Sequence, residues 1–202
     1  MAEASESGSV STVLGGAGEG VKTRKSGIVT GGSIGYFVGM TRTGIGFDAH
    51  RLVEGRRLVI GGVEIPHERG LLGHSDADVL AHAVMDALLG AIADGDIGQH
   101  FSDKDPRWKN ADSIELLRQV TARLQTKGWR VVNTDATVMA EAPRLAPHIA
   151  RMRERLAEAM SVTPEQVSVK ATTVEGMGAI GRREGITAMA VATVEKVEAT
   201  KQ

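Results

Sequence analysis

The 202-residue sequence contains no cysteine and very few aromatic residues. Without cysteine the chain cannot form disulfides, iron–sulfur centres or a cysteine nucleophile, so histidine and carboxylate side chains must bind any metal. Aromatic residues make up 3%, too few for a base-stacking surface. A net charge of -1 argues against nucleic acid as a partner, and no apolar run reaches the ~18 residues of a membrane span. The absence of cysteine favours a reducing, cytoplasmic setting.

The composition changes close to Met40. Residues 1–40 contain 10 of the 25 glycines, are rich in serine and show no apolar periodicity, which predicts a flexible Gly/Ser-rich N-terminal extension. Basic residues at 22–25 before the apolar run 27–40 resemble a secretion signal, but the run lies far from the N-terminus and is interrupted by glycines. A natural start at Met40 is a further alternative. Residues 41–197 are predicted to form one folded domain.

Strand and helix patterns alternate through this domain, which predicts an α/β (α+β) fold with one sheet. Ser75 or Asp76 is expected to cap the first helix, and Asp112 or Asn110 the second. Glycines 61 and 62 are expected to form a turn between two short strands. Short strands are predicted at Ile45, Phe47, 57–60, 63–66, 129–132, 136–139, 167–171 and 186–194, and helices over 78–93, 111–126 and 146–160.

Two segments combine histidine with carboxylate. On a strand, Asp48 and His50 point to the same face and offer one oxygen and one nitrogen ligand, although such a pair is often only a surface feature. His82 lies one turn into an apolar helix and is either a satisfied core histidine or a metal ligand. In both interpretations Asp86, four residues later, could accept its second N–H. His74 and Ser75 lie before the helix N-terminus, where an anion would be stabilised.

A third segment, Lys170–Gly185, joins a strand end to a glycine-rich turn. Hydroxyl and backbone N–H groups at such a strand end can bind phosphate. Glu175 is an oxygen ligand suited to Mg²⁺. The alternative is a long surface turn with an ion pair between Arg182 and Glu184.

Taken together and in this order, the segments of residues 43–196 resemble the 2-C-methyl-D-erythritol 2,4-cyclodiphosphate synthase family. The combination is far more specific than any one motif. The segments that carry the resemblance are GFDAH (46–50), IGGVEIP (60–66), GLLGHSDADVLAHAVMDALLGA (70–91), GDIGQHFSD (95–103), ADS (111–113), AEAPRLAPHI (140–149), KATTVEGMG (170–178) and GRREGI (181–186).

The resemblance implies a single mixed sheet backed by helices, and a homotrimer around a threefold axis with active sites between subunits. It also implies conversion of 4-diphosphocytidyl-2-C-methyl-D-erythritol 2-phosphate into the cyclic diphosphate, with release of CMP, in non-mevalonate isoprenoid biosynthesis. The attacking phosphate is already ionised at neutral pH. The reaction therefore needs charge neutralisation and in-line placement more than it needs a strong general base.

The resemblance also implies roles for individual residues. Zn²⁺ would be bound by Asp48, His50 and His82, and Mg²⁺ or Mn²⁺ by Glu175 together with the substrate phosphates. A mobile loop carrying His74 and Ser75 would close over the substrate. Further substrate contacts are implied for Asp96, Ile97 and Gly98 (methylerythritol), for Ala140, Pro143, Arg144 and Leu145 (cytosine), for Thr172 and Thr173 (diphosphate), and for Arg182 (the threefold cavity).

Two other functions fit the same residues. A zinc hydrolase would use the Asp48, His50 and His82 site to activate water and would need no Mg²⁺. A trimeric binding or scaffold domain would retain the fold without catalysis. The presence of all four expected metal ligands argues against the second of these.

Overall fold

The structure is a computed structural model that describes residues 40–197, so the expected extension 1–40 lies almost wholly outside the described residues. The elements along the chain are β1 (Thr41–Glu54), β2 (Leu58–Ile60), β3 (Val63–Ile65), β4 (Arg69–Leu71), α1 (Val79–Ala91), α2 (Ile97–His100), the 3₁₀ turn Pro106–Trp108, α3 (Ser113–Thr126), β5 (Trp129–Met139), the 3₁₀ turn Ala146–His148, α4 (Ile149–Met160), the 3₁₀ turn Pro164–Gln166, β6 (Val167–Thr172), α5 (Gly178–Gly181) and β7 (Gly185–Lys196).

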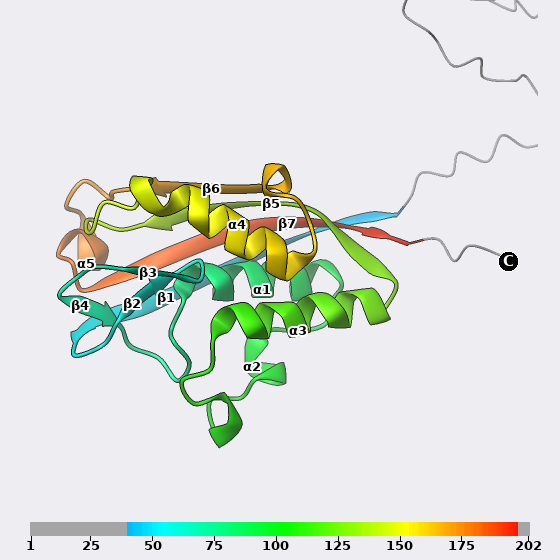
Figure 1. The fold of residues 1–202 in the computed structure, drawn as a ribbon, viewed down its shortest axis with the longest axis horizontal. Helices are drawn as coiled ribbons and strands as arrows, with labels where there is room; N and C mark the ends of the chain where they lie inside the picture. The colour runs from blue at the N-terminus through cyan, green and yellow to red at the C-terminus, as the bar shows by residue number, and fades with distance from the viewer. Residues whose placement is uncertain (1–39, 198–202) are drawn as a thin grey trace, which may run out of the picture. The chain divides into compact units, whose positions relative to one another are not determined.

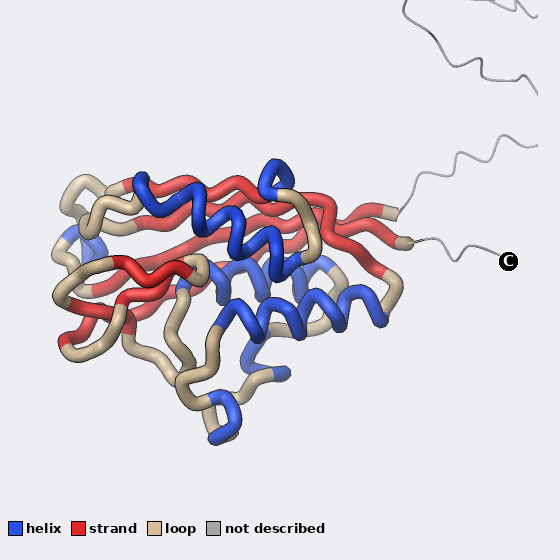
Figure 2. Tube along the Cα trace, viewed as in Figure 1, coloured by secondary structure: helices blue, strands red, loops and turns tan. Residues whose placement is uncertain are grey.

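Five strands form a mixed sheet in the order β4-β1-β7-β5-β6, which confirms the predicted mixed sheet. Only β5 and β6 are parallel, while β7 pairs antiparallel with both β1 and β5. Strands β2 and β3 form a separate two-stranded sheet, joined at Gly61 and Gly62 as predicted, so the expectation of a single sheet was incomplete. Figure 2 shows β1 and β7 running side by side.

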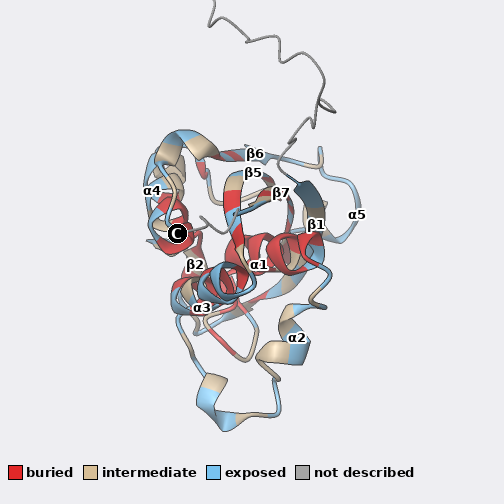
Figure 3. Ribbon diagram, turned by 90° about the vertical axis from the view of Figure 1, so that its right-hand side faces the viewer, coloured by how far each residue is buried: buried red, intermediate tan, exposed pale blue. Residues whose placement is uncertain are grey.

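Helices α1, α3 and α4 cover one face of the five-stranded sheet (Figure 1). Helix α1 is buried almost all round, as Figure 3 shows, because it packs between the sheet and α3. The strand residues that alternate with this buried face point the other way. Ile45 is 65% and Phe47 56% exposed on β1, and Met189 and Val191 are exposed beside them on β7. The described chain therefore leaves one apolar sheet face open.

Close approach of α1 to β1 depends on two glycines. A Cβ atom on Gly46 would lie 2.0 Å from the carbonyl oxygen of Ala83, and one on Gly44 would lie 2.1 Å from that of Ala87. Both carbonyl groups belong to the backbone of α1, which cannot move aside locally. Glycine is thus required where the helix crosses the strand.

We expect Gly46→Ala to lower the free energy of unfolding by about 1–3 kcal/mol or more, because α1 must shift away from β1. Gly90→Ala is the matched control. Gly90 lies on α1 itself, and the nearest atom to an added Cβ would be the carbonyl oxygen of Ile45, at 3.9 Å. The Gly90→Ala variant should therefore gain up to about 1 kcal/mol in the free energy of unfolding, because alanine favours the helix more than glycine does. Urea denaturation of both variants tests this, and equal stability of the two would contradict the packing argument.

Several predicted boundaries were wrong for identifiable reasons. The separate strands at Ile45 and Phe47 belong to the single strand β1, because its glycines interrupt the strand pattern without ending the strand. Likewise 129–132 and 136–139 form one strand, β5, with an irregularity after Val131. The N-cap of α1 is Asp78, whose side chain accepts from the N–H groups of Leu80 and Ala81, and not Ser75 or Asp76.

The remaining helix predictions are closer to the structure. Asp112 caps α3 as predicted, and its side chain accepts from the N–H group of Ile114. Helix α4 begins at Ile149 because residues 146–148 form a 3₁₀ turn. The short elements β4, α2 and α5 were not predicted. No described helix has the length and apolar character needed to cross a bilayer.

Candidate active site

Strand β1 and helix α1 bring three predicted metal ligands together. The carboxylate oxygen Oδ2 of Asp48 lies 2.9 Å from Nδ1 of His82 and 2.9 Å from Nε2 of His50. The two imidazole nitrogens are 3.1 Å apart. Asp48 and His50 lie on the α1-facing side of β1, as do Gly44 and Gly46, so the glycine contact that seats the helix also sets the spacing between these ligands.

The donor atoms of this group fit a metal ion. A tetrahedral zinc ion with bonds of about 2.0–2.1 Å separates its ligand atoms by about 3.3 Å, so these three atoms would need to spread by only a few tenths of an ångström. His50 Nδ1 lies 2.8 Å from the carbonyl oxygen of Leu72, which can only accept. His50 therefore donates from Nδ1, and its Nε2, beside Asp48 and His82, is the nitrogen left to bind a metal ion.

The electrostatics of the group are consistent with this arrangement. Burial opposes ionisation of Asp48, but hydrogen bonds with His50 and His82 outweigh it, and the pKa of Asp48 is well below its usual range. Burial likewise opposes protonation of His82, yet its contact with Asp48 raises the pKa of His82 above the ordinary value. A proton on His82 would compete with a metal ion for the same nitrogen, and metal binding would release it.

A cavity of about 520 Å³ opens beside the three ligands. One side of the cavity is polar and carries Asp48, His50 and His82. Another side is aromatic: the rings of Phe101 and Trp108 pack edge to face there, with their centroids 5.1 Å apart. Its lining residues are Asp48, His50, Gly73, His74, Ser75, His82, Met85, Ile97, Gly98, Phe101, Asp103, Trp108 and Leu116. The volume is in the range of small-molecule binding sites.

Most predicted residues of the N-terminal half of the domain line this cavity. His74 and Ser75 are in its wall, and His74 Nε2 donates to the carbonyl oxygen of Asp105 at 3.1 Å. Ile97 and Gly98 also line it, at the start of α2. Asp96 is the N-cap of that helix, where its side chain accepts from the N–H group of Gln99, so it lies next to the cavity without being in its lining.

The other predicted residues form a second group at the ends of β5 and β6. Glu175 has a left-handed backbone (φ 54°), and its carboxylate accepts from the hydroxyl of Thr173 at 2.9 Å. The predicted Arg182–Glu184 ion pair is present at 2.6 Å. None of the group lines the 520 Å³ cavity of the described chain. Its members are Ala140, Pro143, Arg144, Leu145, Thr172, Thr173 and Glu175, whereas Arg182 lies apart from them, between α5 and β7.

The sheet relates the two groups. The register aligns His50 with Ile186, and the neighbouring Thr187 with Met139, which pairs in turn with Thr172. Both groups therefore lie at the same end of the sheet. His50 on β1 and Thr172 on β6 are three strand spacings apart, which is about 14 Å.

Two interactions differ from the sequence-based expectation or were missed by it. Asp86 makes no hydrogen bond to His82 but accepts from the N–H group of Ile97 at 2.8 Å. Ser113 takes the expected place beside the His82 ring, at 3.0 Å. Glu141 accepts from the N–H groups of Val174 and Gly176, on both sides of Glu175. Ser113 lies in the motif ADS and Glu141 in AEAPRLAPHI, and no other feature of the sequence marks either residue as part of the site.

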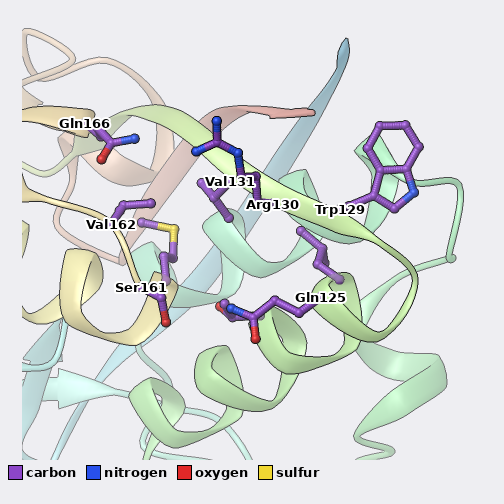
Figure 4. Close-up of a pocket in the computed structure, with 10 residues that line it drawn as sticks. Gln125, Trp129, Arg130, Val131, Ser161, Val162 and Gln166 are labelled. Atoms are coloured by element: carbon purple, nitrogen blue, oxygen red, sulfur yellow. The ribbon is translucent and has the colours of Figure 1, made fainter. Parts of the chain in front are cut away.

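A smaller pocket of about 90 Å³ lies between α3, β5 and the turn after α4 (Figure 4). Its wall includes Gln125, Trp129, Arg130 and Gln166. Gln166 donates to the carbonyl oxygen of Val132, and Arg130 pairs with Glu195. The lining offers neither a histidine nor a carboxylate, so the candidate chemistry lies in the larger cavity.

Comparison with known proteins identifies similar chains. Residues 41–195 match the model of the YgbB family. The chain is 61% identical over 155 residues to 2-C-methyl-D-erythritol 2,4-cyclodiphosphate synthase of Syntrophomonas wolfei, covering 77% of this chain and 99% of that one. It is 63% identical over 150 residues to the protein of the same name from Moorella thermoacetica, covering 74% of this chain and 92% of that one.

Solved structures of similar chains have the same fold. A 2C-methyl-D-erythritol-2,4-cyclodiphosphate synthase structure in a form bound to CDP matches with a TM-score of 0.70 and 35% identity, covering 76% of this chain and 100% of that chain. The bifunctional IspDF of Campylobacter jejuni matches with a TM-score of 0.77 and 39% identity, covering 81% of this chain and 44% of that chain.

Proposed function

The chain belongs to the YgbB family, and from this membership we propose that it acts as a 2-C-methyl-D-erythritol 2,4-cyclodiphosphate synthase in isoprenoid biosynthesis. The observation that carries the proposal is the convergence of Asp48, His50 and His82 at one cavity, in a chain that shares 61% identity with a synthase of this name over nearly its full length. The substrate is 4-diphosphocytidyl-2-C-methyl-D-erythritol 2-phosphate.

The reaction is an intramolecular phosphoryl transfer. An oxygen of the 2-phosphate forms a bond to the β-phosphorus. The bond from that phosphorus to the oxygen bridging to the α-phosphate breaks, and CMP leaves with the electron pair. No bond to hydrogen breaks at the attacking oxygen, which is already ionised at neutral pH. A strong general base is therefore unnecessary, and placement with charge neutralisation governs the rate.

We assign the binding roles by position. Asp48, His50 and His82 would hold Zn²⁺, while Glu175 would hold Mg²⁺ or Mn²⁺ together with the substrate phosphates. Bound there, the two cations would neutralise the phosphate charges and stabilise the leaving group.

Substrate contacts follow from the two groups of residues. His74 and Ser75 line the cavity beside the ligands and would contact the substrate, while Asp96, Ile97 and Gly98 would contact the methylerythritol portion. Phe101 and Trp108 form an apolar wall that would limit water near the reacting phosphates. The second group at the ends of β5 and β6 would contact the nucleotide.

Incubation of the purified protein with the cytidyl substrate tests the function directly. We expect stoichiometric CMP and cyclic diphosphate, with a requirement for a divalent cation. Inorganic phosphate from simple esters without Mg²⁺ would instead support the zinc hydrolase. Absence of any product from a folded, metal-loaded protein would support the non-enzymatic domain.

We further propose that the active unit is a homotrimer with the sheet faces turned toward the threefold axis. Two features of the described chain support this. Ile45, Phe47 and Met189 expose an apolar sheet face. The sheet order separates His50 on β1 from Thr172 on β6 by about 14 Å within one subunit. A neighbouring subunit could bring its Thr173 and Glu175 to the cavity of the first, which would complete a site between subunits.

Phe47→Lys should therefore reduce the assembly from about three times the 21.3 kDa chain mass toward the monomer and abolish CMP release. A charged side chain in a buried apolar interface is strongly unfavourable. Gln119→Lys, on the exposed surface of α3, is the matched control and should leave both unchanged. Multi-angle light scattering with the activity assay measures this. A fully active monomer would refute the trimer.

We propose that residues 41–197 form the catalytic domain and that residues 1–39 are dispensable for it. The family match covers 41–195, and the Syntrophomonas wolfei relative is matched over 99% of its length by 77% of this chain. A chain starting at Met40 should release CMP at the same rate as the full chain. A clear loss of turnover would contradict this.

A further inference from the structure

We infer that Ser113 and Asp76 are positioning residues for His82, which hold the imidazole by Nε2 so that Nδ1 is the nitrogen that faces Asp48 and His50 and is left to bind a metal ion. The inference rests on the proposed role of these three residues as zinc ligands. It assigns a task to two side chains that touch neither the proposed metal nor the cavity.

The direction of each hydrogen bond follows from the chemistry of the groups. The Ser113 hydroxyl lies 2.5 Å from Oδ1 of Asp76, and the Ser113 N–H group donates to Oδ2 of the same carboxylate at 3.1 Å. An ionised carboxylate can only accept, so the single hydroxyl proton of Ser113 points to Asp76. The Ser113 oxygen is then left with acceptor lone pairs alone.

The His82 ring contacts that oxygen. Nε2 of His82 lies 3.0 Å from the Ser113 oxygen, which can accept but has no second proton to give. Nε2 must therefore carry the imidazole proton and donate it. With the Nε2 proton held by the Ser113 oxygen, Nδ1 is the ring nitrogen left to bind a metal ion. In the described structure Nδ1 donates to the Asp48 carboxylate at 2.9 Å, and metal binding would release that proton.

Ser75 is the competing partner, since its hydroxyl oxygen lies 3.1 Å from the same Nε2. That oxygen also accepts from the N–H group of Ala77, and no carboxylate fixes its proton. It could therefore donate to Nε2 or accept from it, and it does not define the tautomer. Ser113 is fully buried (0% exposed), so a water molecule cannot readily replace its hydroxyl.

The hydrogen bonds that link His82 to Ser113 and Ser113 to Asp76 also fix the position of the imidazole ring. Asp76 belongs to the loop before α1, and its backbone N–H donates to the carbonyl oxygen of Ala111 at 3.0 Å. Ser113 is the first residue of α3, and His82 lies on α1. Three segments therefore meet at the Nε2 side of the imidazole, and the ring is oriented before any ligand binds.

The experiment measures zinc affinity of the full-length protein by competition with a chromophoric chelator. We expect Ser113→Ala to weaken zinc binding by roughly 10–100-fold, because the outer partner of the imidazole is lost. Asp76→Ala should weaken it as well, since the freed hydroxyl can turn its proton toward Nε2. Asp76→Asn keeps an acceptor oxygen and should recover part of the affinity.

Thr134→Val is the matched control. Thr134 is a buried residue whose hydroxyl has no hydrogen-bond partner in the described structure, so the variant removes a buried hydroxyl without breaking such a bond. Its zinc affinity should equal that of the parent. Equal affinity in Ser113→Ala, Asp76→Ala and Thr134→Val would overturn the inference.

A second measurement separates positioning from a purely structural role. In zinc-loaded protein labelled with ¹⁵N-histidine, the Nε2–H resonance of His82 should lie downfield and exchange slowly. Ser113→Ala should move it upfield and speed its exchange, and an unchanged resonance would overturn the inference. Both readouts are independent of CMP release. A chain that binds zinc in this way but does not turn over the cytidyl substrate would contradict the proposed function alone.

Discussion

Replacement of His82 by alanine is expected to abolish zinc binding and CMP release together. Asp48 and His50 alone offer two donor atoms, and a catalytic zinc site uses three protein ligands. Because a bound cation contributes several kcal/mol of charge stabilisation, turnover should fall by about a thousand-fold or more. Elemental analysis and the CMP assay on the same preparation measure both quantities.

His67→Ala is a suitable control for this variant. His67 does not line the cavity, and its Nε2 has no hydrogen-bond partner in the described chain. This variant should keep one zinc ion per subunit and its activity. Circular dichroism establishes whether each variant is folded. If folded His82→Ala retains both metal and turnover, Asp48, His50 and His82 are not the zinc site.

Glu175→Gln is expected to keep zinc and the fold but to lose about 100–1,000-fold in turnover. Glu175 is exposed and is not one of the three side chains whose ligand atoms converge beside the cavity, so zinc occupancy should not depend on it. The amide is nearly the same size as the carboxylate but carries no charge. It would therefore bind a divalent cation weakly at the point where the diphosphate charge must be neutralised.

The sensitivity of this variant to magnesium distinguishes metal binding from loop structure. Raising the Mg²⁺ concentration should partly restore turnover in Glu175→Gln if the lost ligand is the cause. Glu154→Gln, an exposed carboxylate on α4, serves as the control and should behave as the parent. Loss of zinc from Glu175→Gln, or parental turnover, would show that the role assigned to Glu175 is wrong.

Local sequence rules predicted the parts of the site that depend on one element. The two-residue period of a strand is enough to place Asp48 and His50 on one face, and helix periodicity placed His82 on an apolar helix. The hydrogen-bond partner of His82 could not be predicted from strand or helix periodicity. Asp86 is four residues away on the same helix, yet the ring points to Ser113, which is 31 residues distant and brought close only by packing of α3.

The length of β1 shows a second limit. Glycine is unfavourable within strands, so Gly44 and Gly46 suggested short, broken strands. In the structure they are needed because α1 passes directly over them, which is a tertiary requirement that no local propensity encodes. The short elements β4, α2 and α5 contain three or four residues each and are too brief for any periodicity to be detected.

The place of β7 in the sheet has a consequence for biosynthesis. This strand is the last element of the domain, yet it lies in the middle of the sheet and pairs with β1, from which it is separated by the 130 residues 55–184. During translation β1 and β5 would remain unpaired with β7, the strand between them, until β7 leaves the ribosome. Their edges would be exposed in the meantime. We therefore expect ribosome-bound chains lacking residues 185–196 to recruit chaperones and resist folding, even though Asp48, His50 and His82 have all been synthesised.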